Sequence, residues 1–157
     1  MYRTRDLLGL KVFNKEGKSL GSVCDLSLDY FNSKVRGFLV SKKIFSKRNY
    51  VDLNNIISLS NTVMTKELYA HRGLKFSEIK NLKVLNKEGK LLGILDDLLI
   101  DCDFSIKGII IVEGFFEKFK NGKKIISIKE SILGEKTILF LGDEKVSMRM
   151  LPRKKLF

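Results

Sequence analysis

The sequence predicts an all-β protein made of two tandem small β-barrels joined by a short, partly helical linker. Three observations lead to this fold class. Residues 10–29 recur as residues 82–101 with 13 of 20 positions identical, the apolar residues fall in short alternating runs, and turn residues separate those runs. A repeat of about 70 residues is too long for a solenoid unit and long enough for a small domain.

Each copy begins with a hairpin. Strand residues 11–13 and 83–85 are followed by the same turn, Asn-Lys-Glu-Gly, and the hairpin requires a left-handed residue at Gly17 and Gly89. The return strand then shows the same irregularity in both copies, because its apolar alternation shifts by one position near Asp25 and again at the equivalent residue of the second copy. A shared shift of phase predicts a β-bulge or a sharp bend.

The next strand of each copy follows a glycine and is apolar on both faces, which predicts close packing inside a closed or nearly closed sheet. Ten residues are therefore expected to serve turns, bends or close approaches: Gly17, Gly21, Asp25, Asp29, Gly37, Gly89, Gly93, Asp97, Asp101 and Gly108.

Length differences between the copies are confined to connections, as expected when strands are retained and loops vary. A single helical turn leads into the first strand of each copy, with Ser77 as the expected N-cap of the second. The expected organisation is a first barrel at residues 1–66, a linker at 67–73, a second barrel at 74–145 and a basic C-terminal tail at 146–157.

The pattern G-x-x-[LI]-G-x-[VL]-x-D-L-x-[LI]-D, followed by [VI]-[RK]-G and an apolar run, resembles the PRC-barrel family. This family includes the barrel of the photosynthetic reaction centre H subunit and the C-terminal barrel of the ribosome maturation factor RimM. The resemblance covers most of the chain as two copies, and it implies a module that docks on other macromolecules without a shared cofactor or reaction. The membrane-spanning helix of the first relative and the N-terminal domain of the second have no counterpart in this sequence, so neither activity is carried across.

The chain has 30 Lys and Arg against 18 Asp and Glu, a formal net charge of +12, which favours an anionic partner. Its N-terminus lacks the pattern of a signal peptide and no apolar run is long enough to span a membrane. A cytoplasmic protein is therefore expected. The two cysteines, Cys24 and Cys102, have no CxxC spacing and are expected to be small buried hydrophobic residues.

The recurring aspartates raise the question of an enzyme. Paired carboxylates can act as acid and base or hold a metal, and Asp25 and Asp29 recur in the second copy. Four residues apart on a strand, however, they are separated by about 13 Å. A carboxylate beside a bulge or turn commonly accepts hydrogen bonds from backbone N–H groups, so a structural role is expected.

Other catalytic signals are weak. Asp96 has Cys24 at its place in the first copy, which argues against a shared triad, and His71 is the single histidine, exposed in the linker. No phosphate-binding loop or nucleophile motif occurs. We therefore expect no enzyme, no cofactor and no metal, and rank a hydrolase third among the functions.

The positive charge is concentrated in equivalent connections of the two copies, where aromatic residues are interleaved with basic ones, a mixture suited to phosphates and exposed bases. Such charge runs are also typical of a solvated loop. The function expected first is a non-enzymatic docking or assembly adaptor, and the alternative is an RNA- or ribosome-associated protein. The expected partner is a protein, then RNA or the ribosome, and last an anionic membrane surface. The basic residues are Lys42, Lys43, Lys47, Arg48, Lys118, Lys120, Lys123 and Lys124.

Overall fold

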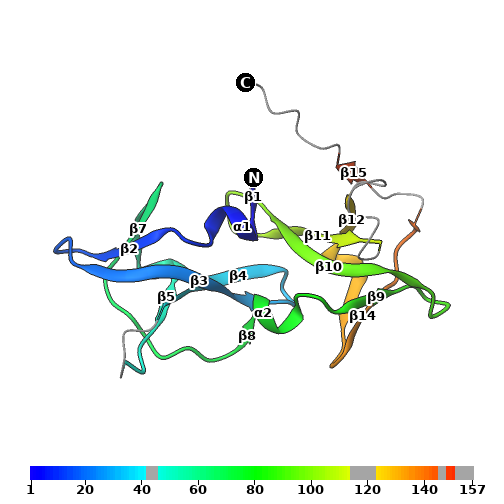
Figure 1. The fold of residues 1–157 in the computed structure, drawn as a ribbon, viewed down its shortest axis with the longest axis horizontal. Coiled ribbons are helices and arrows are strands. Elements are labelled where there is room, and N and C mark those ends of the chain that lie inside the picture. The colour runs from blue at the N-terminus through cyan, green and yellow to red at the C-terminus, as the bar shows by residue number, and fades with distance from the viewer. Residues whose placement is uncertain (42–45, 114–122, 145–147, 151–157) are drawn as a thin grey trace. The chain divides into compact units, whose positions relative to one another are not determined.

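The computed structural model describes residues 1–41, 46–113, 123–144 and 148–150 (Figure 1). The described chain is mainly β, and its contacts divide it into two compact units. The first comprises Met1–Glu78 together with Asp101–Ser105, and the second comprises Ile79–Ile100 and the described residues from Ile106 onward. The prediction of an all-β protein with two domains is confirmed. No helix in the described ranges is long and apolar enough to cross a membrane.

The first unit has the strand order β5-β4-β3-β2-β7-β6, with β8 paired to β3. Strands β2 and β7 are parallel, whereas β3 pairs antiparallel with β2, β4 and β8. Its elements are β1 (Tyr2–Arg3), α1 (Thr4–Leu7), β2 (Lys11–Asn14), β3 (Ser19–Asp29), β4 (Lys34–Val40), β5 (Tyr50–Asp52), the 3-10 helix η1 (Leu53–Asn55), β6 (Ile56–Leu59), β7 (Thr62–Thr65) and β8 (Leu74–Lys75).

The second unit follows the short helix α2 (Phe76–Ile79) and repeats this plan, with the order β13-β14-β9-β10-β11-β12-β15. Its one parallel pair among the described strands, β9 with β14, corresponds to β2 with β7. The elements are β9 (Lys83–Leu85), β10 (Leu91–Ile100), β11 (Ile106–Val112), β12 (Lys123–Ser127), the 3-10 helix η3 (Ile128–Glu130), β13 (Ser131–Leu133), β14 (Thr137–Phe140) and β15 (Met148–Met150).

Strands β4 and β11 are buried along their apolar runs, as expected for strands packed on both faces. The glycine that precedes each run permits a close approach of the next strand. A Cβ atom on Gly37 would overlap the Val51 carbonyl oxygen, and one on Gly108 would lie 2.7 Å from Cγ2 of Ile125. Both positions therefore require a residue without a side chain.

The predicted phase shift is a β-bulge in both units. In the first, the pairing of β3 with β4 shifts register between Val23 and Asp25, and in the second that of β10 with β11 shifts between Leu95 and Asp97. The extra residue of the first bulge is Cys24. One extra residue on one strand disrupts the ladder locally and increases the twist.

Both cysteines are exposed, so the expectation that they are buried hydrophobic residues is wrong. Cys24 faces solvent because it is the extra residue of the bulge, whereas Val23 and Asp25 on either side of it are buried. Cys102 lies in the turn after β10, where its side chain does not join the core.

The helical turns that lead into the two copies are capped alike. The Arg3 N–H donates to Asp6 Oδ2 at 2.7 Å, and the Lys75 N–H donates to Glu78 Oε2 at 2.6 Å. Ser77 is not the N-cap, because the turn already begins at Phe76. The helical part of the connection is α2, whereas residues 67–73 contain no helix.

The turn between β10 and β11 belongs to the first unit. Phe104 accepts a hydrogen bond at its carbonyl from the Val35 N–H at 2.9 Å, and its ring lies edge-on to Phe38 with centroids 5.9 Å apart. Lys34 and Asp103 form an exposed ion pair at 3.5 Å. A segment of the second sequence copy thus completes the core of the first unit.

Candidate functional site

The bulge aspartates are buried and bonded to the backbone. Asp25 Oδ1 accepts from the Leu26 N–H at 2.8 Å and from the Ser77 N–H at 3.2 Å. In the second unit, Asp97 Oδ1 accepts from the Leu98 N–H at 2.8 Å. Because a bulge leaves N–H groups without a ladder partner, these carboxylates compensate for the irregularity that the fold requires.

The aspartates at the strand ends have a similar local role. Asp29 accepts from the backbone N–H and the side-chain amide of Asn32, both at 3.0 Å, and these bonds lower the pKa of its carboxyl. Asp101 Oδ1 accepts from the Cys102 N–H at 2.8 Å. Within the described ranges, no group of three or more His, Cys, Asp or Glu side chains is placed to hold a metal ion.

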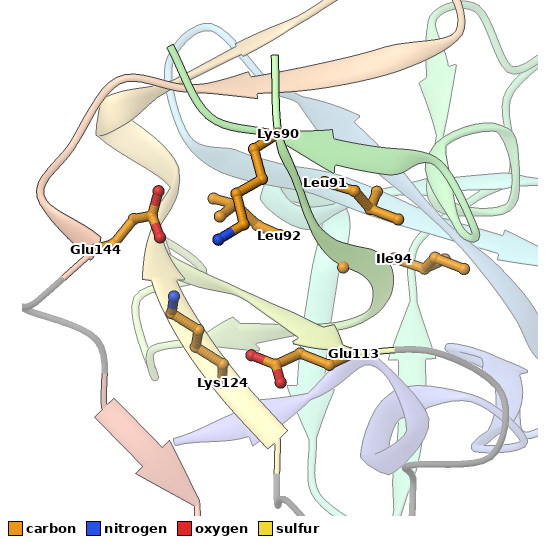
Figure 2. A pocket seen from close by; sticks show the side chains of 8 residues that line it. Lys90, Leu91, Leu92, Ile94, Glu113, Lys124 and Glu144 are labelled. Atoms are coloured by element: carbon orange, nitrogen blue, oxygen red, sulfur yellow. The ribbon is translucent and has the colours of Figure 1, made fainter. Parts of the chain in front are cut away.

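A cavity of about 330 Å³ lies in the second unit. Figure 2 shows Lys90 and Lys124 reaching toward the same hollow, with Glu113 and Glu144 at its sides. Glu144 Oε1 also accepts from the side-chain amide of Asn86 at 2.7 Å. Two cations and two carboxylates balance one another, so the cavity does not select for an anion on charge alone.

The rest of this cavity is apolar, with lining from Leu91, Leu92 and Ile94. The sequence analysis did not identify this set, because its members come from separated strands and only the sheet register brings them together. Residues Leu91 to Leu95 are apolar except for Gly93, so the sequence of β10 does not show which of its side chains line the cavity.

The first unit contains a polar cluster around its only histidine. His71 Nε2 lies 3.0 Å from Ser27 Oγ, and the His71 ring is edge-on to Tyr50 at 5.3 Å. The Tyr50 hydroxyl donates to the Arg36 carbonyl at 3.0 Å and to Asp52 Oδ2 at 3.3 Å. Burial raises the pKa of Tyr50 to about 12 and lowers the pKa of His71. His71 is half-buried, not exposed as expected, because residues 67–73 lie along β5.

The contact of His71 with Ser27 has the distance of a nucleophile and its base. A catalytic pair also needs a group that orients the imidazole, and among the described residues no carboxylate accepts a hydrogen bond from His71. The cluster borders a cavity of about 570 Å³ that is also lined by Phe31 and Arg72. The equivalent positions of Ser27, Tyr50 and Asp52 in the second unit are Leu99, Ile125 and Ser127, so the network belongs to one copy.

The basic residues singled out by sequence are placed as follows. Lys42, Lys43, Lys118 and Lys120 lie outside the described residues. Lys47 and Arg48 are exposed before β5. Lys123 and Lys124 lie in β12, where Lys123 pairs with Asp96 and Lys124 lines the cavity of the second unit.

Some large apolar side chains face solvent on equivalent strands of the two units. Ile57 on β6 is 48% exposed and Ile132 on β13 is 54% exposed. These two strands form one edge of each sheet. Phe31, in the turn between β3 and β4, is 93% exposed. The sequence analysis did not single out these residues, because an exposed apolar residue cannot be told from a core residue without the register.

The architecture is that of a tandem all-β protein whose recurring glycines and aspartates serve turns, bulges and close approaches. The sequence model of the PRC-barrel domain family matches residues 1–72 and again residues 71–146. The chain therefore belongs to the PRC-barrel domain family, in two copies, as the resemblance of its repeated motif predicted. A comparison with curated proteins finds no match.

Proposed function

We propose that this protein is a non-enzymatic docking or assembly adaptor that acts in the cytoplasm. The observation that carries the proposal is the outward placement of Ile57 and Ile132 on equivalent edge strands of the two units. An apolar side chain in water gains free energy when a partner covers it. An exposed isoleucine on the same edge strand of both units supports a surface that is used twice.

The distribution of polar groups supports the same proposal. The aspartates of the repeated motif accept hydrogen bonds from the backbone, and the contact of Ser27 with His71 lacks an orienting acid among the described residues. Both observations favour a role in surface contacts over a role in catalysis.

The test is affinity purification of the full chain with chemical cross-linking, before and after nuclease treatment. A defined protein that survives nuclease and is lost from an Ile57→Ser, Ile132→Ser double variant supports the adaptor. A matched variant, Leu8→Ser, removes an exposed apolar residue away from these strands and should retain the partner. Recovery of no protein, or equal recovery by both variants, would contradict the proposal.

The second candidate is association with RNA. Lys47 and Arg48 are exposed, and no carboxylate of the described chain lies within ion-pair distance of either. RNA binding through phosphates weakens with salt, with a log–log slope of roughly −0.7 per contact on a single strand. Four contacts would give a slope of about −3. Changing Lys42, Lys43, Lys47 and Arg48 to Gln should then reduce the slope, and a wild-type chain without salt-dependent RNA binding would exclude this function.

A further inference from the structure

An apolar row crosses the outer face of the second unit. Sheet register places Ile132 opposite Leu139, Leu139 opposite Leu85, and Leu85 opposite Leu91. Residues in direct cross-strand register share one face of a sheet. The four side chains therefore form a continuous line over β13, β14, β9 and β10, which we name the apolar row.

The apolar row is accessible, and the opposite face of the same strands is the core. Ile132 is 54% exposed and Leu91 is 51% exposed, whereas Leu85 and Leu139 are half-buried. On the opposite face of these strands, Val84 pairs with Ile138, and both residues are completely buried. The exposed ends of the row are therefore not needed to fill the core.

The first unit provides an internal reference. Its equivalent row runs from Ser58 to Met64, Phe13 and Ser19. Serine thus stands at both ends of this row, and both serines are exposed. The same fold accepts polar ends, so the isoleucine and leucine of the second unit are not demanded by the architecture.

Positive charge accompanies the apolar row. Lys83 lies two residues before Leu85 on β9 and so projects from the same face. Lys90 directly precedes Leu91, but its side chain points into the cavity of the second unit and not along the row (Figure 2). Lys83 is exposed, and no carboxylate of the described chain lies within ion-pair distance of it. A second copy of this chain, with its own charge of +12, would meet electrostatic repulsion here, whereas an acidic partner would be attracted.

We propose that the apolar row is the docking site for an acidic amphipathic helix of a partner protein. Four residues on adjacent strands span about 14 Å, the length of about ten helical residues. A helix with apolar residues at intervals of three and four would cover the row. Its acidic residues would then lie within reach of Lys83. This inference rests on the proposed adaptor function and names the partner's chemistry.

The test is a selection from a display library of random 16-residue peptides, with the full chain as bait. The enriched peptides are expected to carry Asp or Glu and apolar residues at helical spacing. Affinity for an enriched peptide should fall at least tenfold in a Leu91→Ser, Ile132→Ser variant, which reproduces the serines of the first unit. A Lys83→Gln variant should weaken binding and reduce its dependence on salt, whereas Lys90→Gln, which changes a lysine of the cavity, should do neither.

Two controls make the result specific. A Phe31→Ser variant removes a more exposed apolar residue of the first unit and should bind the peptide like wild type. Circular dichroism should show helix only in the bound peptide. Peptides that are basic, or that bind the Leu91→Ser, Ile132→Ser variant as well as wild type, would overturn the inference.

Three further outcomes would also overturn it. The first is that no peptide is enriched. The second is that Leu91 and Ile132 are needed for binding to anionic vesicles but not to peptides, and the third is that the chain self-associates and the same variant does not. The adaptor function is judged separately. A partner that is recovered from cells but binds the Leu91→Ser, Ile132→Ser variant normally contradicts the apolar row alone, whereas recovery of no partner contradicts the adaptor function.

Discussion

The two units share a strand order, but they differ in the side chains that stand at equivalent positions. In the first unit, Ser27, Tyr50 and His71 form a hydrogen-bonded cluster. The second unit has Leu99 and Ile125 at the positions of the serine and tyrosine. The hairpin turn, the bulge and the glycine before the buried strand are the same in both. Residues that both units retain build the fold, and residues that differ give each unit its own surface.

Replacing the glycine before the buried strand should give the largest difference in stability loss between the two units. We expect Gly37→Ala to lower the free energy of unfolding by about 3 kcal/mol, because the new Cβ meets a backbone carbonyl that cannot move alone. Gly108→Ala should cost less, about 2 kcal/mol, because the new Cβ meets a side-chain methyl of Ile125 at 2.7 Å and the Ile126 carbonyl oxygen only at 3.0 Å. Urea denaturation of the full chain measures both free energies of unfolding. Equal losses would show that the neighbouring strand packs equally closely against Gly37 and Gly108.

The bulge aspartates should matter similarly in both units. Asp25→Ala removes the acceptor of the Leu26 and Ser77 N–H groups, and Asp97→Ala removes the acceptor of the Leu98 N–H, each at an expected cost of about 2 kcal/mol. Asn substitutions should cost less because the amide oxygen still accepts a hydrogen bond. A thermal melt of the four variants tests this, and alanine variants as stable as wild type would rule out the structural role.

A pH response should be confined to the first unit. Burial, followed by the charge of Lys75, lowers the pKa of His71 below its ordinary value of 6.5. The unfolded chain therefore takes up the proton first as the pH falls. The stability contributed by neutral His71 is complete above pH 6.5 and is lost as the pH falls through that value toward the folded pKa.

Unfolding measured from pH 7.5 to about 5 should consequently show a steeper loss for wild type than for a His71→Gln variant. The second unit has no histidine, since His71 is the only one in the chain. Identical pH profiles for the two proteins would mean that His71 titrates alike in the folded and unfolded states.

The smallest effect on stability is expected at the exposed isoleucines. Ile57→Ser and Ile132→Ser should each change the free energy of unfolding by no more than about 0.5 kcal/mol, because both side chains already face water. Chemical denaturation provides the measurement. A larger loss at either position would indicate that the isoleucine packs within its own unit and is not available to a partner.

Local patterns predicted the repeated features well. Gly17 and Gly89 adopt φ of +79° and +78°, the left-handed conformation that the hairpin turn requires, and the bulge lies where the alternation shifts. These features depend on a few neighbouring residues.

Features that depend on long-range pairing were not predictable in the same way. The outward direction of Cys24 follows from its place as the extra residue of the bulge. The apolar row follows from the parallel pairing of β9 with β14, whose residues are more than fifty positions apart. A run such as Leu-Leu-Gly-Ile-Leu shows apolar character but not which side chain meets the core.

Phe104 gives the repeat a further consequence. Its ring and carbonyl complete the first unit from beyond the end of the first copy, and β8 pairs with β3 in the same way. A fragment of residues 1–72 would lack both. Such a fragment should fold poorly alone and gain structure when residues 73–157 are added as a separate chain, as in fragment complementation. We therefore expect the boundaries at which the sequence repeats to differ from those at which the protein can be divided.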